Sequence, residues 1–271
     1  MATILAGRAA YDTRVNLDAY LARIGLARPL PPTLDTLRRL HVAHLGAFTF
    51  HNLQIQRRGS VPVDVESIER KFLGAEGGGY CFEMNTLFGA ALRELGFEVT
   101  TLLARVGPPE KAALNHMLLR VDVDGRPWLA DVGFGGEGLL EPLPLEDGVR
   151  MMQAGIEYSL RRDAHQWILS MRCGDQSEEM FEFADAPHTA GDVEMANYFT
   201  STHPSSIFRR TLTIQRATPE ERVILRPAAI TRYRDGVRTE IPIEPAQLRR
   251  FARELFGIDL GEAALLFEEM G

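Results

Sequence analysis

The sequence has few cysteines, no long apolar run and no excess of basic residues. Its two cysteines, Cys81 and Cys173, are too few for a disulfide framework, and the first residues do not read as a secretory signal. No apolar run approaches the roughly 20 residues that a membrane span needs. A net charge of -7 provides no overall basic field for nucleic acid. We therefore expect a cytoplasmic protein that binds neither membranes nor nucleic acid and acts on small molecules.

Patterns of apolar residues divide the chain into three parts. Residues 12–57 read as helical, with Asp12 or Asn16 as the first cap, and another helix follows the glycines at 77–79. Short β-rich runs then predict strands at residues 98–106, 115–123, 126–132, 156–162, 165–173 and 178–183. Further strands near residues 211–216, 222–230 and 230–234 precede a helix over 245–256. The middle part predicts an antiparallel barrel or sandwich between two other units.

The approach to Cys81 consists of three glycines and Tyr80. Glycines let the backbone turn sharply and let a ligand come close, and they place Cys81 in the first turn of the helix that follows. Unpaired N–H groups at a helix start carry partial positive charge, which favours a thiolate, the form of cysteine that attacks carbonyl groups. The alternative is that Cys81 is a small buried apolar residue, the interpretation that we give to Cys173.

A β-hairpin supplies a candidate base. Asp124-Gly125 lies between two apolar-rich runs, which is a strong signal for a tight hairpin turn. A hairpin centred there pairs Val121 with Trp128 and makes His116 and Asp131 diagonal neighbours on one face, about 7–8 Å apart. Asp131 would then hold one imidazole nitrogen of His116 and leave the other free to accept a proton.

Together these residues would form a Cys-His-Asp triad, in which His116 takes the proton of Cys81. A surface His-Asp pair without catalytic meaning is the alternative for this hairpin. A second glycine-rich loop, residues 133–136, follows Asp131 directly and is suited to exposing backbone N–H groups to an acyl oxyanion or a phosphate.

Three segments carry a resemblance to a known family: Gly78-Gly79-Tyr80-Cys81-Phe82-Glu83-Met84-Asn85, Asn115-His116-Met117-Leu118-Leu119 and Asp131-Val132-Gly133-Phe134-Gly135. In their order and spacing they resemble the arylamine N-acetyltransferases, and residues 40–52 and 201–208 extend the resemblance over nearly the whole chain. The resemblance implies an α+β fold with an N-terminal helical domain (residues 1–96), a central antiparallel β-barrel (97–187) and a C-terminal α/β lid (188–271), around a core like that of cysteine proteases.

The resemblance also implies roles for single residues. Cys81 would be the nucleophile that takes an acetyl group from acetyl-CoA, His116 would activate it and Asp131 would orient His116, before the acetyl group passes to an aromatic amine or hydrazine. The side chains of Phe50 and Phe134 would line the acceptor pocket. The residues implied for CoA binding are Gly133, Gly135, Gly136 and Phe208.

Two positions depart from the family pattern. Gly77 stands where the family usually has arginine, and His51 stands where it usually has glutamate. Because those usual residues carry opposite charges, we hypothesise that they form an ion pair that is lost jointly here.

Three other functions stay open at this point. A relative with another acyl donor, or an amide synthase of the same family, would share the triad. A Cys-His-Asp hydrolase is a rival from another reaction class, and a non-enzymatic binding module is the last. A metal enzyme is not expected, because His41, His44 and His51 have no carboxylate or cysteine spaced to complete a site.

Overall fold

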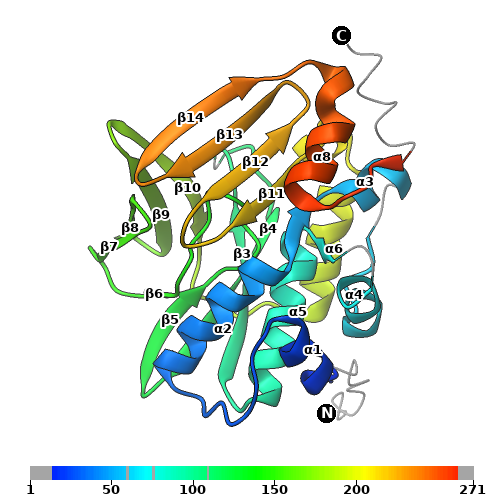
Figure 1. Ribbon diagram of the computed structural model, residues 1–271. Helices are drawn as coiled ribbons and strands as arrows, with labels where there is room; N and C mark the ends of the chain where they lie inside the picture. Colours follow the sequence, from blue (N-terminus) through cyan, green and yellow to red (C-terminus); the bar gives the residue numbers. More distant parts are fainter. Residues whose placement is uncertain (1–13, 59–60, 75–76, 109, 262–271) are drawn as a thin grey trace, which may run out of the picture.

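A computed structural model describes residues 14–58, 61–74, 77–108 and 110–261. The fold is α+β: helices predominate near the N-terminus, an eight-stranded antiparallel sheet curls into a nearly closed barrel, and helices precede and follow a run of strands in the C-terminal region. In Figure 1 the barrel lies to the left, the N-terminal helices below and to the right, and the C-terminal sheet above.

Several of the N-terminal helices start at a side chain that accepts a backbone hydrogen bond. They are α1 (Leu17–Arg23), α2 (Leu34–Ala47), α3 (Leu53–Arg58), α4 (Val65–Phe72) and α5 (Cys81–Glu94). Asn16 caps α1 by accepting from the N–H of Ala19 at 3.1 Å, as predicted, whereas Asp12 lies outside the described residues. Thr33 and Asp64 cap α2 and α4 in the same way. The helix predicted after the glycines is confirmed as α5.

Two short strands interrupt these helices, and the first of them corrects the prediction that residues 12–57 are helical. Strand β1 (Thr49–His51) pairs in parallel with β2 (Gly78–Gly79) and antiparallel with β11 (Ile214–Ala217). A side chain at Gly78 would overlap the backbone of Thr49, so this pairing needs glycine there. The first third of the chain thus belongs partly to a sheet completed by the last third.

The barrel sheet has the strand order β6-β5-β4-β3-β10-β9-β8-β7. Its strands are β3 (Glu98–Arg105), β4 (His116–Val123), β5 (Arg126–Ala130), β6 (Leu143–Pro144), β7 (Arg150–Gln153), β8 (Ile156–Asp163), β9 (Gln166–Cys173) and β10 (Gln176–Phe183). Val121 pairs with Trp128, which confirms the predicted register. Asp124 and Gly125 have φ of 52° and 72°, the left-handed values that the two-residue turn requires.

The C-terminal region contains α6 (Ala190–Thr202), α7 (Ile207–Arg210), a short 3-10 helix (Pro245–Gln247) and α8 (Leu248–Phe256). Strands β11, β12 (Arg222–Arg226), β13 (Ala229–Arg234) and β14 (Val237–Pro242) form one sheet with β1 and β2. The three predicted strands and the final helix are confirmed, while α6 and β14 had not been predicted. The division into three domains remains a prediction, since this sheet joins the first part to the last.

Helix α5 lies at the centre of the largest apolar core. Its residues are buried on nearly all sides, against α1, α4 and strands β3 and β4. A second core fills the barrel and a third lies beneath α8. Within the described residues no helix is long and apolar enough to cross a membrane. Cys173 is buried, as predicted, and its thiol donates to the carbonyl oxygen of Gly236 at 3.2 Å.

Candidate active site

Cys81 is the first residue of the central helix α5. The carboxylate of Glu83 accepts from the backbone N–H of Tyr80 at 3.1 Å and pairs with the ammonium of Lys71 at 2.8 Å, which fixes the helix start. Cys81 is only 2% exposed, and its Sγ lies 4.0 Å from the carbonyl oxygen of Asn115. The predicted position of Cys81 in the first turn of a helix is confirmed.

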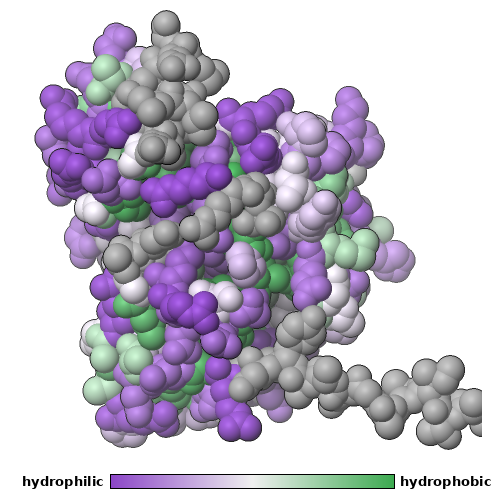
Figure 2. Space-filling model, turned by 90° about the vertical axis from the view of Figure 1, so that its right-hand side faces the viewer, coloured by the Kyte–Doolittle hydropathy of each residue, from purple (hydrophilic) through white to green (hydrophobic). Residues whose placement is uncertain are grey.

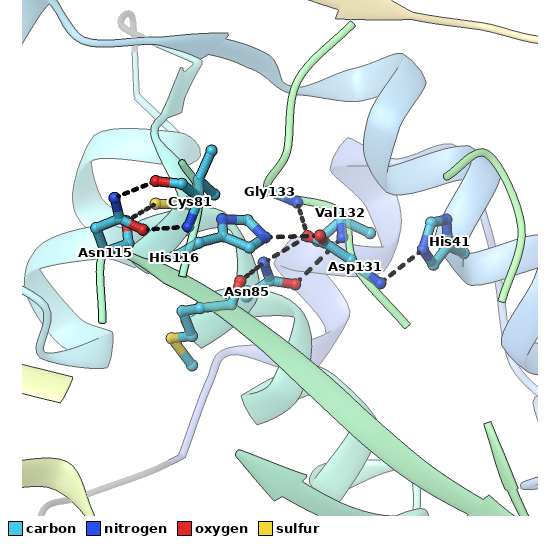
Figure 3. Close-up of polar contacts among 10 residues, drawn as sticks. His41, Cys81, Asn85, Asn115, His116, Asp131, Val132 and Gly133 are labelled. Carbon is cyan, nitrogen blue, oxygen red and sulfur yellow. Dashed lines mark hydrogen bonds and ion pairs between the residues drawn. The ribbon is translucent and has the colours of Figure 1, made fainter. Parts of the chain in front are cut away.

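The predicted contact between His116 and Asp131 is confirmed. His116 is the first residue of β4 and Asp131 follows the end of β5, so the hairpin brings them together. Nε2 of His116 lies 2.7 Å from Oδ2 of Asp131, and the two residues are 3% and 1% exposed. In Figure 3 the His116 ring lies between Cys81 and Asp131, with Nδ1 on the side of Cys81.

Electrostatics favour a charged His116–Asp131 pair. Burial alone would lower the pKa of His116, but the charge and hydrogen bond of Asp131, together with the hydrogen bond and charge of Cys81, raise this pKa to about 10. Burial would raise the pKa of Asp131, yet its net direction is downward because His116, Asn85 and the N–H of Gly133 stabilise the carboxylate. At neutral pH the site therefore favours an imidazolium next to Cys81.

Asn85 ties the helix to the hairpin. Its Nδ2 donates to Oδ1 of Asp131 at 2.9 Å and to the carbonyl oxygen of Met117 at 2.7 Å, and its Oδ1 accepts from the N–H of Val132 at 3.2 Å. Every polar atom of this buried amide is used. No role had been predicted for Asn85, although its spacing of four residues from Cys81 places both on one helix face.

His41 holds the backbone of Asp131 from the other side. Its Nε2 accepts from the N–H of Asp131 at 3.2 Å, and its Nδ1 lies 2.8 Å from the carbonyl oxygen of Leu140. Burial lowers the pKa of His41 to about 4, so the ring is neutral, with its proton on Nδ1. The expected buried role of His41 is confirmed, and the described residues contain no cluster of His, Cys, Asp or Glu suited to a metal ion.

The glycine-rich loop after Asp131 packs directly on the helix start. A Cβ on Gly133 would lie 2.8 Å from Cα of Cys81, so only glycine fits there. The N–H of Gly133 donates to Asp131 at 2.8 Å, and that of Gly136 donates to Oε1 of Gln215 at 2.7 Å. These two N–H groups are thus used within the protein. This corrects the expectation from the sequence that the loop exposes them to a ligand.

The loop is also held by a buried arginine that sequence reasoning missed. Arg222, which is 1% exposed, donates through Nη1 to the carbonyl oxygens of Gly136 and Gly138. Its guanidinium lies 5.7 Å from the ring centre of Tyr158, whose hydroxyl also donates to the carbonyl oxygen of Gly138. The last third of the chain therefore fixes the loop beside Cys81.

Aromatic rings surround His116 on the barrel side. The ring centres of Phe134 and Phe181 lie 5.4 Å and 5.2 Å from that of His116, and 5.5 Å from each other. These rings exclude water from the imidazole and give it an apolar wall. Phe134 was predicted at the site, whereas Phe181, from β10, was not, because nothing in its strand pattern distinguishes it from a core residue.

A second aromatic cluster brings together Phe50, which was expected to contact the acceptor amine, and Phe208, which was expected to contact CoA. The ring of Phe208 lies 6.1 Å from that of Phe50 and 5.6 Å from that of Tyr80, the residue before Cys81. The side chains of Asn52 and Gln56 hold the carbonyl oxygen of Phe208 at 2.9 Å and 2.6 Å. Phe208 thus lies with the predicted acceptor residue Phe50.

Arg23 occupies the space beside Gly77. A Cβ on Gly77 would lie 2.9 Å from Nη2 of Arg23, whose guanidinium also lies 5.8 Å from the ring centre of Phe48. Helix α1 thus supplies a guanidinium near the position where the family usually has an arginine. The joint loss, at Gly77 and His51, of an ion pair between the usual arginine and glutamate remains a hypothesis.

Known proteins share this sequence and architecture. A family model described as N-acetyltransferase matches residues 33–265. An arylamine N-acetyltransferase / N-hydroxyarylamine O-acetyltransferase from Salmonella typhimurium is 35% identical over 93% of this chain and 92% of its own length. Crystal structure analysis of the Nocardia farcinica arylamine N-acetyltransferase gives a match with a TM-score of 0.88 and 34% identity, covering 96% of both chains.

A structure of the Mycobacterium marinum arylamine N-acetyltransferase in complex with CoA matches with a TM-score of 0.87 and 32% identity, over 94% of this chain and 99% of that one. These matches span helices, barrel and C-terminal region alike. The chain belongs to the arylamine N-acetyltransferase family.

Proposed function

We propose that the protein transfers an acetyl group from acetyl-CoA to an aromatic amine or hydrazine through a thioester on Cys81, in a ping-pong sequence. The observation that carries this proposal is the buried His116–Asp131 pair, 2.7 Å between Nε2 and Oδ2, beside Cys81 at the start of α5. Family membership and the CoA complex of the Mycobacterium marinum relative support acetyl-CoA as the donor. A reducing cytoplasm, where Cys81 stays a free thiol, suits this chemistry.

In the first half-reaction the thiolate of Cys81 attacks the carbonyl carbon of acetyl-CoA. A new bond forms between Sγ and that carbon, and the bond from the carbon to the CoA sulfur breaks. CoA leaves as a thiol by taking the proton that His116 holds. The raised pKa of His116 supports this role, because the imidazolium both stabilises the thiolate and supplies the proton.

In the second half-reaction the amine nitrogen attacks the acetyl carbonyl carbon on Cys81. The bond between that carbon and Sγ breaks, the amine proton passes to His116, and the thiolate–imidazolium pair is restored. Asp131 keeps Nε2 occupied throughout, so Nδ1 is the nitrogen that exchanges protons. Phe50 and Phe134 are proposed to contact the arylamine ring, with Phe208 beside Phe50.

CoA is proposed to approach along the loop that contains Gly133, Gly135 and Gly136. Gly135 has φ of 97°, and a side chain at Gly136 would collide with Ile224, so the loop keeps a bare backbone. Gln215 and Arg222 hold this backbone through hydrogen bonds to the N–H and the carbonyl oxygen of Gly136. A rigid, bare loop beside Cys81 allows a thioester to approach without obstruction by side chains.

Acyl loading tests the proposed function directly. Purified protein mixed with acetyl-CoA, without amine, should gain the mass of one acetyl group, located on Cys81 by peptide mass spectrometry. Addition of an arylamine should remove the group and yield the acetylated amine. An adduct that water discharges as fast as the amine does would indicate a hydrolase, and loading only by longer acyl-CoA donors would indicate another acyltransferase. No covalent adduct with any donor would contradict the proposal.

The contact of His41 with Asp131 gives a second expected result. In His41→Leu the buried N–H of Asp131 loses its acceptor, which costs about 1–3 kcal/mol, and we expect kcat to fall about tenfold or more with little change in KM. In His41→Gln the amide oxygen can accept the same N–H, and most of kcat should return. If both variants are as active as the native protein and unfold at the same temperature, His41 does not position Asp131.

A further inference from the structure

A cavity of about 320 Å³ lies behind the catalytic helix, between the beginnings of α4 and α6. Thr86, Ala90 and Arg93 of α5 line it. At 3.6 residues per turn, these side chains point about 120–180° around the helix from Cys81. The cavity is therefore separate from the acyl-transfer site.

One part of this cavity is apolar. Ala90, Met117 and Val193 are each buried and line it from α5, β4 and α6. Figure 2 shows the side of the molecule that carries α4 and α6, where hydrophilic residues project and hydrophobic residues lie in the recesses between them. An apolar wall with a volume of this order fits a small organic molecule.

Another part of the cavity carries a positive charge without a carboxylate partner. Arg93 donates through Nη2 to the carbonyl oxygen of Val99 at 3.2 Å and to Oγ1 of Thr101 at 3.3 Å, both neutral. Within the described part of the chain it forms no ion pair. Although part of Arg93 is exposed, surrounding protein atoms lower the pKa of its guanidinium, because burial disfavours the charge.

His188 adds a buried ring nitrogen that has no hydrogen-bond partner among the described residues. This nitrogen is Nδ1, whereas the backbone N–H of His188 donates to the carbonyl oxygen of Thr101 at 3.0 Å. Both His188 and Arg93 line the cavity next to the beginning of α6, where Thr189 and Ala190 also face it. The carboxylate of Asp192 holds that helix start by accepting from the N–H and the hydroxyl of Thr189, both at 2.7 Å.

Three acidic side chains, Asp64, Glu66 and Glu194, also line the cavity. Asp64 accepts from the N–H of Ser67 at 2.8 Å as the cap of α4, and Glu66 pairs with Arg70 at 2.8 Å. Glu194 is likewise engaged with a partner. Arg93 is the one Lys or Arg side chain among the residues that line the cavity, and in the described part of the chain no ion pair joins it to these carboxylates.

We propose that this cavity is a second binding site, for a small aromatic or aliphatic monocarboxylate, whose apolar part contacts Met117 and Val193 and whose carboxylate contacts Arg93 and His188. The site goes beyond the proposed acetyl transfer and does not depend on it. It lies directly behind the active site, since Met117 follows His116 in β4 and its carbonyl oxygen accepts from Asn85 at 2.7 Å.

The test uses 4-fluorobenzoate, which has no amine to acetylate. The full chain is labelled with ¹³C on the methionine methyl groups, and the Met117 signal is assigned with Met117→Leu. We expect a saturable shift of that signal and of the fluorine resonance. Binding should weaken about tenfold or more in Arg93→Gln, which loses a charge-assisted hydrogen bond, but not in Arg39→Gln, which removes a surface arginine on α2.

Two further measurements locate the site. Alkylation of Cys81 should leave the binding unchanged, and the neutral 4-fluorobenzamide should bind about tenfold more weakly than the acid, because it lacks the charge. The proposal is overturned if Met117 shows no saturable shift, if folded Arg93→Gln binds as well as the native protein, or if alkylation of Cys81 abolishes binding. The last outcome would assign the ligand to the acyl-transfer site. Each result is independent of whether acetyl-CoA loads Cys81.

Discussion

Replacement of Cys81 by serine should abolish acyl loading and reduce kcat/KM by about 10⁵-fold or more, the scale seen when a covalent nucleophile is removed. The physical reason is that a serine hydroxyl is far less acidic than a thiol, so His116 cannot hold it as the anion that attacks a thioester. Sulfur and oxygen differ little in size, and Cys81 is buried at the start of a well-packed helix, so the fold should persist.

Cys173→Ser is the matched control for this variant. It makes the same change at the other buried thiol, whose Sγ contacts the carbonyl oxygen of Gly236, far along the chain from the triad. Loading with acetyl-CoA, followed by intact mass and by steady-state rates with an arylamine, should be lost in Cys81→Ser and kept in Cys173→Ser. Loading that persists in a folded Cys81→Ser protein would show that the nucleophile is a different residue.

The local part of this site could be predicted from the sequence because it depends on short-range geometry. A tight turn at residues 124–125 fixes the hairpin register, and that register alone brings His116 to Asp131. Likewise, three glycines followed by an apolar helix pattern were enough to place Cys81 in a first turn. Neither inference needed to know where the rest of the chain lies.

The parts that could not be predicted depend on pairings between distant segments. Strands β1 and β2 have three and two residues, too few to show an alternating pattern, and they are recognisable only through pairing with each other and with β11. The loop after Asp131 is held by Gln215 and Arg222, whose hydrogen bonds to Gly136 join residues 79 and 86 positions apart. Nothing local in their sequence separates them from surface polar residues.

Asn85 and His41 both form hydrogen bonds with Asp131, but only Asn85 could have been recognised from the sequence. Asn85 lies one helical turn after Cys81, so a polar residue on that otherwise buried helix was a recognisable signal. His41 lies in the interior of α2, and its hydrogen bond to the N–H of Asp131 joins residues 90 positions apart. Only the packing of α2 against the end of β5 reveals it.

Asp131→Asn should cost far more activity than stability. The amide is nearly the same size as the carboxylate, so packing is kept, but it removes the charge that holds His116 protonated. By analogy with the serine protease triad, where the same change lowers kcat about 10⁴-fold, we expect a loss of about 10³–10⁴-fold. Asp122→Asn, at a partly exposed aspartate on the same hairpin that pairs with Arg120, is the matched control and should keep its activity.

Titration shows whether the loss arises from charge. In the native protein His116 has a pKa of about 10, above its ordinary value, so its contribution to folding is present in full below about pH 6.5 and is lost as the pH rises through 10. Asp131, whose pKa is lowered, contributes above its ordinary value and loses that contribution on acidification. In Asp131→Asn the charge of Asp131 no longer opposes burial, and only Cys81 still raises the pKa of His116, so this pKa should fall clearly below its native value of about 10. Nuclear magnetic resonance of the imidazole protons would follow this change, and the difference in stability between native protein and variant should shrink at both ends of the pH range. An unchanged pKa of His116, or near-native turnover in a folded variant, would mean that Asp131 does not orient the base.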